Sequence, residues 1–443
     1  ISAQVSPLQV DTLKETKIPD QWDLQSCIDY AKEQNITIRK NRITAVSTQI
    51  DVKTAKAALF PSLSFSTGHQ VVNRPYQETS SRVSGSEIIS SNSKTSYNGN
   101  YGLNASWTLY NGNKRLKTIQ QEKLNNQMAE LDVATSENNI QESIAQVYIQ
   151  ILYAAESVKV NENTLQVSIA QRDRGQELLN AGSIAKSDLA QLEAQVSTDR
   201  YQLVTAQATL EDYKLQLKQL LELDGENEMN IYLPALSDEN VLAPLPTKRD
   251  VYISALSLRP EIEASKLNVE ASELGINIAK SSYFPTISLS AGIGTNHTSG
   301  SDFTFGEQVK NGWNNSIGLS VSVPIFNNRQ TKSAVQKAKL QYETSMLSLL
   351  DEQKALYKTI ESLWLDANSA QQRYAAANEK LKSTQISYEL ISEQFNLGMK
   401  NTVELLTEKN NLLQAQQEQL QAKYMAILNT QLLKFYQGDQ LAI

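Results

Sequence analysis

The 443-residue sequence has one cysteine and two histidines, and these shortages exclude several classes of protein. Cys27 is alone, so it forms no intramolecular disulfide and no cysteine-based zinc site, and we expect a small buried side chain. The sequence contains no HExxH, nucleophile-elbow or phosphate-binding glycine motif. We therefore predict no catalytic residue, no metal site and no cofactor, and we interpret His69 and His297 as exposed polar loop residues.

Long apolar runs and a basic stripe are also absent. No stretch of about 18 apolar residues occurs, which excludes a membrane-spanning helix. Lysine and arginine are dispersed along the sequence and the net charge is −7, so a nucleic-acid partner is not expected. The chain starts at Ile1 with neither a basic start nor an apolar run. We interpret it as a mature chain whose signal peptide has been removed.

Proline and glycine are unevenly distributed, and the gaps between them predict long helices. No proline lies between Gly112 and Leu233 or after Pro324, which leaves two blocks of about 120 residues that can be helical. Gly182, in "ELLNAGSIAKSDLAQ", and Gly398, in "EQFNLGMKNTVELL", interrupt these blocks. Each glycine is typical of a tight turn between two antiparallel helices.

The two blocks belong to an internal repeat. "AKAALFPSLSFSTG" (55–68) matches "AKSSYFPTISLSAG" (279–292) at half of its positions, with an offset of 224 residues. The offset falls to 216 where Asn111 aligns with Asn327 and Gly182 with Gly398. A repeat this long is a duplicated half of one fold. The predicted domains are an extended segment at 1–21, a first repeat at 22–224, a connector at 225–250, a second repeat at 251–436 and a tail at 437–443.

Each repeat is predicted to contain a helix, two strands, a long helix, a turn and a returning helix. In the first repeat these elements are 36–59, 62–72, 98–110, 113–180 and 185–223, with an extracellular loop between the strands. In the second repeat they are 260–283, 286–295, 314–325, 327–396 and 403–436.

The long helices, each roughly 100 Å long, are expected to pack as coiled coils. In the second repeat, apolar and small residues alternate spacings of four and three up to the turn, as coiled-coil packing requires. They are Leu356, Ile360, Leu363, Ala367, Ala370, Tyr374, Ala377, Leu381, Thr384, Tyr388, Ile391 and Phe395. An isolated antiparallel coiled coil explains this seam equally well, so the helices alone do not determine the function.

The predicted strands have an unusual polarity. In "SIGLSVSVPIFNN" (316–328), apolar residues alternate with glycine, serine and proline, and the second face has no charge. An apolar face opposite a small neutral face fits a strand between lipid and a water-filled lumen. The predicted lipid-facing residues are Leu103, Trp107, Leu289, Leu319 and Val321. Four such strands are too few to close a transmembrane barrel, and open edges are not tolerated in lipid, so the chain must oligomerise.

These features resemble the TolC-like outer-membrane efflux proteins. The resemblance rests on "WDLQSCIDYAKEQN" from Trp22, the two "FP" strand entries, "LRPE" around Arg259 and both glycine turns. It implies a mainly α fold whose long antiparallel helical hairpins form an α-barrel in the periplasm. Four strands per chain would join a shared twelve-stranded β-barrel of a homotrimer in the lipid of the bacterial outer membrane. The chain starts without a cysteine for a lipid anchor, so we expect it to lie outside the lipidated branch of the family.

The same resemblance implies a transport function. The trimer would be the exit duct of a tripartite efflux or type I secretion system, working with a periplasmic adaptor protein and an inner-membrane pump. Drugs, small molecules or proteins would pass through it. A secreted or surface coiled-coil adhesin or structural protein with a small β module is the main alternative. Its strands would pack their apolar faces on each other instead of on lipid, and it would stay monodisperse without detergent.

The hairpin tips are the predicted gate and adaptor contact. The adaptor contact is assigned to Gly182, Ser183, Gly398 and Met399. Six residues after each glycine stands a carboxylate, Asp188 or Glu404, and copies gathered at the narrow end would favour cations. The resemblance assigns Lys400 and Phe395 to holding the tip closed, and Thr407 stands where the family often has a second acidic residue. Alternatively, both carboxylates only stabilise the starts of the returning helices through the helix dipole.

Overall fold

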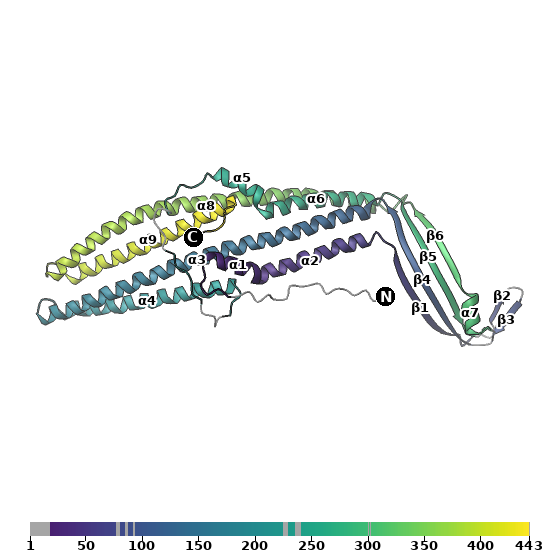
Figure 1. The fold of residues 1–443 in the computed structure, drawn as a ribbon, viewed down its shortest axis with the longest axis horizontal. Helices are drawn as coiled ribbons and strands as arrows, with labels where there is room; N and C mark the ends of the chain where they lie inside the picture. Colours follow the sequence, from purple (N-terminus) through teal and green to yellow (C-terminus); the bar gives the residue numbers. More distant parts are fainter. Residues whose placement is uncertain are drawn as a thin grey trace. The chain divides into compact units, whose positions relative to one another are not determined.

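The computed structural model of the protein describes residues 18–76, 80–84, 87–91, 94–224, 229–234, 241–299, 301 and 303–442. Its elements, labelled in Figure 1, are α1 (Leu24–Gln34), α2 (Ile36–Ala57), β1 (Ser62–Asn73), β2 (Ser80–Ser84), β3 (Glu87–Ser91), β4 (Thr95–Asn111), α3 (Lys114–Asn180), α4 (Lys186–Leu220), α5 (Lys248–Leu258), α6 (Pro260–Ser281), β5 (Thr286–Thr298), α7 (Phe305–Asn311), β6 (Asn314–Ser322), α8 (Gln330–Asn396) and α9 (Thr402–Gln437). Within these described residues, no helix carries an apolar stretch long enough to cross a membrane.

The chain forms two compact units, and each combines corresponding parts of both repeats. The hairpin unit comprises Ile1–Ala45, Met128–Lys266 and Ser348–Ile443, and the sheet unit comprises Val46–Gln127 and Leu267–Leu347. The domains predicted from the sequence follow the repeats, whereas the compact units cut across them. Each repeat therefore supplies half of both units.

One antiparallel sheet, in the order β1-β4-β5-β6, dominates the sheet unit. The four predicted strands are confirmed, although β4 begins at Thr95 and β6 ends at Ser322, two residues before Pro324. Proline lacks the N–H that would continue the ladder. The segment between the first two strands, predicted as an extracellular loop, contains a short hairpin that was not predicted, because Ser80–Ser84 and Glu87–Ser91 pair as β2 and β3. Segments of five residues are too short for a strand period to be recognised reliably.

Three short helices were not predicted. The helix predicted at 36–59 is preceded by α1, and the two are separated by the extended Asn35 (ψ 126°). The corresponding break between α5 and α6 falls at Arg259 (ψ 123°), which precedes Pro260 and is thereby disfavoured in the helical region. α5 also begins within the predicted connector. The third short helix is α7, which starts with a capping box between Thr304 and Glu307.

The predicted returning helix at 185–223 is confirmed between Lys186 and Leu220, and it ends where Glu222 adopts a positive φ of 55°. The predicted coiled-coil seam of α8 is also confirmed, since all of its members are buried or half-buried.

The main core of the hairpin unit joins both hairpins to α1. Its buried side chains include Cys27 of α1, Tyr148 of α3, Leu217 of α4, Tyr374 of α8 and Ile427 of α9. The expectation that Cys27 is a small buried side chain is confirmed, because none of its surface is exposed. Burial raises the pKa of its thiol to about 12, so it stays uncharged at neutral pH.

Candidate functional site

The register of the sheet places the predicted lipid-facing residues on one face. Trp107 pairs with Leu289, which pairs with Leu319, and these side chains therefore form a row across three strands. Leu103 lies in a parallel row, between Phe65 and Ile293. Most large apolar side chains of this face are exposed in the single chain, among them Leu63, Phe65, Leu103, Trp107, Ile293, Ile317, Leu319 and Val321. A large exposed apolar patch of this kind marks a surface that contacts a membrane or another protein.

The opposite face consists of small and polar residues. One row across all four strands reads Ser64, Asn104, Gly292 and Ser316, and the row nearer the helices reads Ser62, Ser106, Ser290 and Gly318. Each outer strand, β1 or β6, has a strand neighbour on one side only within the described residues. The sheet therefore has one apolar face, one small neutral face and two open edges.

The interpretation of the two histidines as loop residues is wrong, because both lie in strands, although His69 is exposed as expected. His69 on β1 and His297 on β5 both pair with Gly99 of β4, so they lie in one row on the apolar face. The Tyr97 hydroxyl lies 2.6 Å from His69 Nδ1, and its ring contacts both imidazoles at centroid distances of 5.8 Å. His69 lies within the predicted strand 62–72, and β5 continues to Thr298, three residues beyond its predicted end, which brings His297 into the sheet. A tyrosine ring such as that of Tyr97 near a strand end is typical of a membrane interface.

The two hairpin tips share one backbone geometry. Gly182 and Gly398 both have a φ of +74°, in the left-handed region that favours glycine. At the first tip, Ser183 N–H donates to the Leu178 carbonyl, and at the second tip Met399 N–H donates to the Gln394 carbonyl. These bonds form Schellman motifs that satisfy the last carbonyls of α3 and α8. The predicted helix, glycine turn and returning helix are thus confirmed in both repeats.

The predicted gate carboxylates both lie in the first turn of a returning helix. The Ala185 N–H donates to Asp188 Oδ2 at 3.0 Å, but alanine has no side-chain acceptor with which to cap the helix in return. At the second tip the box is complete, because Asn401 N–H donates to Glu404 Oε2 at 3.2 Å and Glu404 N–H donates to Asn401 Oδ1 at 2.9 Å. The geometry therefore accounts for both carboxylates as helix caps.

The remaining predicted tip residues have different environments. Lys400 Nζ lies 2.6 Å from Glu404 Oε1, and this hydrogen bond, followed by that from Asn401, lowers the pKa of Glu404. Phe395 is buried against Leu192 and Leu405, so in the single chain it stabilises the packing of the tip. Thr407 is exposed and its hydroxyl donates to the Val403 carbonyl at 2.8 Å. Ser183 and Met399 are exposed at the turns themselves.

A buried polar cluster connects the hairpins and was not predicted. Lys409 of α9 pairs with Asp199 of α4, and its ammonium also donates to the Ser168 hydroxyl of α3. Both charged side chains are at most 4% exposed, and burial lowers the pKa of Lys409 while Asp199 opposes this shift. The sequence contains a signal for this pair, because each residue stands at coiled-coil spacing between apolar residues, Asp199 between Val196 and Leu203 and Lys409 between Leu405 and Leu412.

A second buried charge lies where α5 meets α6. Arg259 donates to Glu142 and Glu261, each at 2.8 Å, and its guanidinium carbon lies 4.0 Å from the Tyr436 ring centroid. Burial raises the pKa of Glu142 even though Arg259 lies against it. The corresponding residue of the first repeat, Asn35, has no charge and donates to the Leu220 carbonyl at 3.0 Å.

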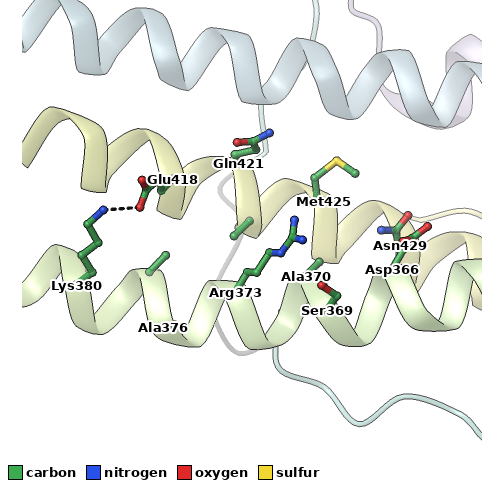
Figure 2. A pocket seen from close by; sticks show the side chains of 12 residues that line it. Asp366, Ser369, Ala370, Arg373, Ala376, Lys380, Glu418, Gln421, Met425 and Asn429 are labelled. Atoms are coloured by element: carbon green, nitrogen blue, oxygen red, sulfur yellow. Dashed lines mark hydrogen bonds and ion pairs between the residues drawn. The ribbon is translucent and has the colours of Figure 1, made fainter.

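A groove of about 480 Å³ lies between α8 and α9. Figure 2 shows Arg373 reaching from α8 toward α9, above a floor that includes Ala370, and the Lys380–Glu418 ion pair at one end. None of the described residues that line the groove is a histidine or a cysteine. Its small floor and charged rim are those of a helix-packing surface rather than of a catalytic pocket.

Comparison with known proteins identifies the family. The model of the outer membrane efflux protein family matches residues 27–222 and 251–438, one segment in each repeat. The chain belongs to this family. Its members are efflux proteins rather than enzymes, and they are located in the bacterial outer membrane and extend into the periplasm.

Relatives of known name are distant. The outer membrane efflux protein BepC of Brucella suis biovar 1 (strain 1330) is 24% identical over 294 residues, which cover 66% of this chain and 61% of BepC. The outer membrane protein TolC of Escherichia coli (strain K12) is 24% identical over 294 residues, which cover 64% of this chain and 58% of TolC. The chain thus spans less than two thirds of the length of these relatives.

Solved structures of efflux proteins share the fold over almost the whole chain. CusC, described with transmembrane channel formation, superposes with a TM-score of 0.79 at 19% identity and covers 94% of this chain and 92% of its own. VceC of Vibrio cholerae superposes with a TM-score of 0.76 at 16% identity and covers 95% and 97%. The predicted fold class, mainly α with a four-stranded membrane sheet, is confirmed.

Proposed function

We propose that this outer membrane efflux protein is a trimeric exit duct of a tripartite efflux or type I secretion system. The four-stranded sheet, with its exposed apolar face, its small neutral face and its two open edges, is the observation that carries the proposal. Hydrocarbon tolerates no unpaired strand edge, so further strands from other copies must pair with β1 and β6. Three copies would supply about twelve strands, within the range of closed transmembrane barrels.

The two faces assign the inside and the outside of this barrel. Leu103, Leu319 and their row neighbours would contact lipid, while rows such as Ser64, Asn104, Gly292 and Ser316 would line a lumen without charge or bulk. An adhesin would have to cover the apolar face with protein. Among the described residues, however, the large side chains of this face are exposed. This exposure favours the channel over the adhesin.

The hairpin tips would contact the periplasmic adaptor and control the opening. Gly182, Ser183, Gly398 and Met399 present two identical backbone turns, which suits an adaptor that recognises both tips in the same way. Copies of Asp188 and Glu404 around the axis would create a negative ring. Lys400 would partly neutralise the charge of this ring. Because Thr407 is neutral, each chain would add one acidic residue fewer to the ring than the family often has. Phe395 would keep the side chains of the tip packed together. Drugs, small molecules or proteins driven by an inner-membrane pump would be the cargo.

Planar-bilayer recordings test the channel. We expect discrete conductance steps for the purified protein, and Ser320→Arg should reduce the conductance because it adds a charged side chain to the lumen face. The double variant Asp188→Asn with Glu404→Gln should lower the preference for cations over anions. Unchanged selectivity in that variant would show that both carboxylates act only as helix caps, and a lack of any conductance would contradict the channel itself.

A further inference from the structure

The four junctions between strands and helices carry only basic charges. β1 and β5 begin, and β4 and β6 end, at the same edge of the sheet, as the pairing of Ser62 with Ser106 and of Thr286 with Ser322 shows. The flanking segments 52–62, 110–121, 274–286 and 322–342 contain no aspartate or glutamate. Their basic residues, here called the basic collar, are Lys53, Lys56, Lys114, Arg115, Lys117, Lys280, Arg329, Lys332, Lys337 and Lys339. All of them belong to the sheet unit.

One member of the basic collar lines a cavity. A hollow of about 230 Å³ is lined by Leu59, Trp107, Leu109, Tyr110, Arg115 and Leu116, among others. Arg115 Nη1 donates to the Ala58 carbonyl at 2.8 Å, and its Nη2 donates to the Thr108 carbonyl beside the bulge in β4. A guanidinium has five N–H donors, so these two bonds leave donors for another acceptor. Among the described residues no carboxylate pairs with Arg115.

Part of the cavity wall is apolar. Leu109 and Leu116 are 42% and 53% exposed, and Trp107 belongs to the apolar face of the sheet. The Trp107 indole donates to the Leu59 carbonyl at 2.7 Å, which fixes the ring at the rim. A ligand in this cavity would meet both the positive charge of Arg115 and aliphatic side chains.

We propose that this cavity binds the phosphate of a membrane phospholipid in the periplasmic leaflet of the outer membrane. Arginine binds phosphate oxygens through paired N–H donors, and basic pockets beside apolar surfaces bind lipid headgroups. The acyl chains would then lie along Leu109 and Leu116 and continue over the apolar face. The inference rests on the membrane location of the sheet and is independent of what the protein transports.

The second repeat supplies a matched control. The residue that corresponds to Arg115 there is Thr331, which is buried and accepts a hydrogen bond from Asn327 Nδ2. Arg329, close by in the basic collar, is exposed and is not among the residues that line the cavity. The two repeats therefore differ in the binding site while both contribute positive charge to the same edge of the sheet.

Native mass spectrometry of the detergent-purified protein, titrated with phosphatidylglycerol, tests the site. We expect Arg115→Gln to weaken phosphatidylglycerol binding roughly tenfold, as the loss of a charge-assisted contact predicts. Arg329→Gln should change it by less than about twofold because an exposed charge contributes little, and Arg115→Lys should fall between the two. Equal losses for Arg115→Gln and Arg329→Gln would contradict a built site and indicate attraction to the basic collar alone.

Two further arms separate lipid from free phosphate and guard against misfolding. Inorganic phosphate should compete only weakly, because it cannot contact the leucines, and equally tight binding of inorganic phosphate would overturn the assignment to lipid. Leu116→Gln alters the apolar wall without touching the guanidinium contacts, and it should also weaken phosphatidylglycerol binding. If Arg115→Gln fails to fold, an unaltered affinity of Leu116→Gln would still refute the proposal. A failure of conductance with lipid binding intact would refute only the channel.

Discussion

The two repeats of the chain share the backbone of their long helices, main-sheet strands and glycine turns and have diverged in their polar side chains. Both tips turn through a glycine with a φ of +74°, and both leading helices break at corresponding residues, Asn35 and Arg259. The chemistry at these positions differs, because a neutral amide caps a helix end in the first repeat where a buried arginine joins two glutamates in the second. Duplication thus preserved the residues that direct the backbone and left polar positions free to take different roles.

We expect the largest difference in stability between the repeats at the helix breaks, Asn35 in the first repeat and Arg259 in the second. Arg259→Met would leave Glu142 and Glu261 without their partner, and we expect it to lower the free energy of unfolding by about 3 to 5 kcal/mol. Asn35→Ala removes a neutral hydrogen-bonding group and should cost about 1 to 3 kcal/mol. Chemical unfolding in detergent, followed by circular dichroism, measures both. Adding Glu142→Gln and Glu261→Gln to Arg259→Met should recover part of the loss, and equal costs at the two breaks would contradict the distinction.

The sheet should show equivalence between the repeats and a difference between its faces. Leu103 and Leu319 occupy corresponding places on the apolar face, and arginine at either should cost about 2 to 4 kcal/mol near the bilayer midplane. Asn104→Arg and Ser320→Arg, one residue further along on the other face, should leave assembly intact. Unfolding in lipid vesicles and gel analysis of the assembled state measure these effects. Equal harm from both faces would refute the assignment of lipid and lumen.

The tips should differ by one capping side chain. Asn401→Ala removes the N-cap of α9 and should destabilise its first turn by about 1 kcal/mol, whereas Ala185→Asn supplies the missing cap of α4 and should stabilise that turn by a similar amount. Amide hydrogen exchange in the two first turns measures the changes. We expect the two substitutions to change the stability of the first turn in opposite directions. If Ala185→Asn destabilises the first turn of α4, the first tip cannot form a complete capping box.

The second tip should also respond to acid. The Lys400 hydrogen bond and the Asn401 N–H lower the pKa of Glu404, so its stabilising effect is complete above the ordinary glutamate pKa and is lost as the pH falls through the lowered value. The difference in melting temperature between the wild type and Glu404→Gln should therefore shrink only at acidic pH. Lys400→Met removes the largest cause and should move this loss to higher pH. A difference that stays constant throughout the acid range would contradict the role of Glu404.

The sequence predicted those parts of the fold that a periodic pattern or a glycine determines. The strand faces, the α8 seam and both turns followed from spacing, since burial on one face imposes a period. The starts of α2 after Asn35 and of α6 after Arg259 were predicted, but the preceding helices α1 and α5 were missed because each has only 11 residues, about three turns, in which a helical period is hard to recognise. Lys409 and Asp199 stand in seam positions, but their pairing depends on the relative alignment of two hairpins, which no local pattern encodes. The Arg115 cavity likewise requires the bulge in β4 and the turn after α2.

Mass measurement of the protein in detergent tests the central claim most directly, because the main sheet of the described residues has four strands and two open edges. Multi-angle light scattering or native mass spectrometry, corrected for detergent, would give the number of copies. We predict an assembly of three copies that dissociates in the Leu319→Arg variant and persists in Ser320→Arg. A stable monomer in detergent would contradict the shared barrel and, with it, the exit duct.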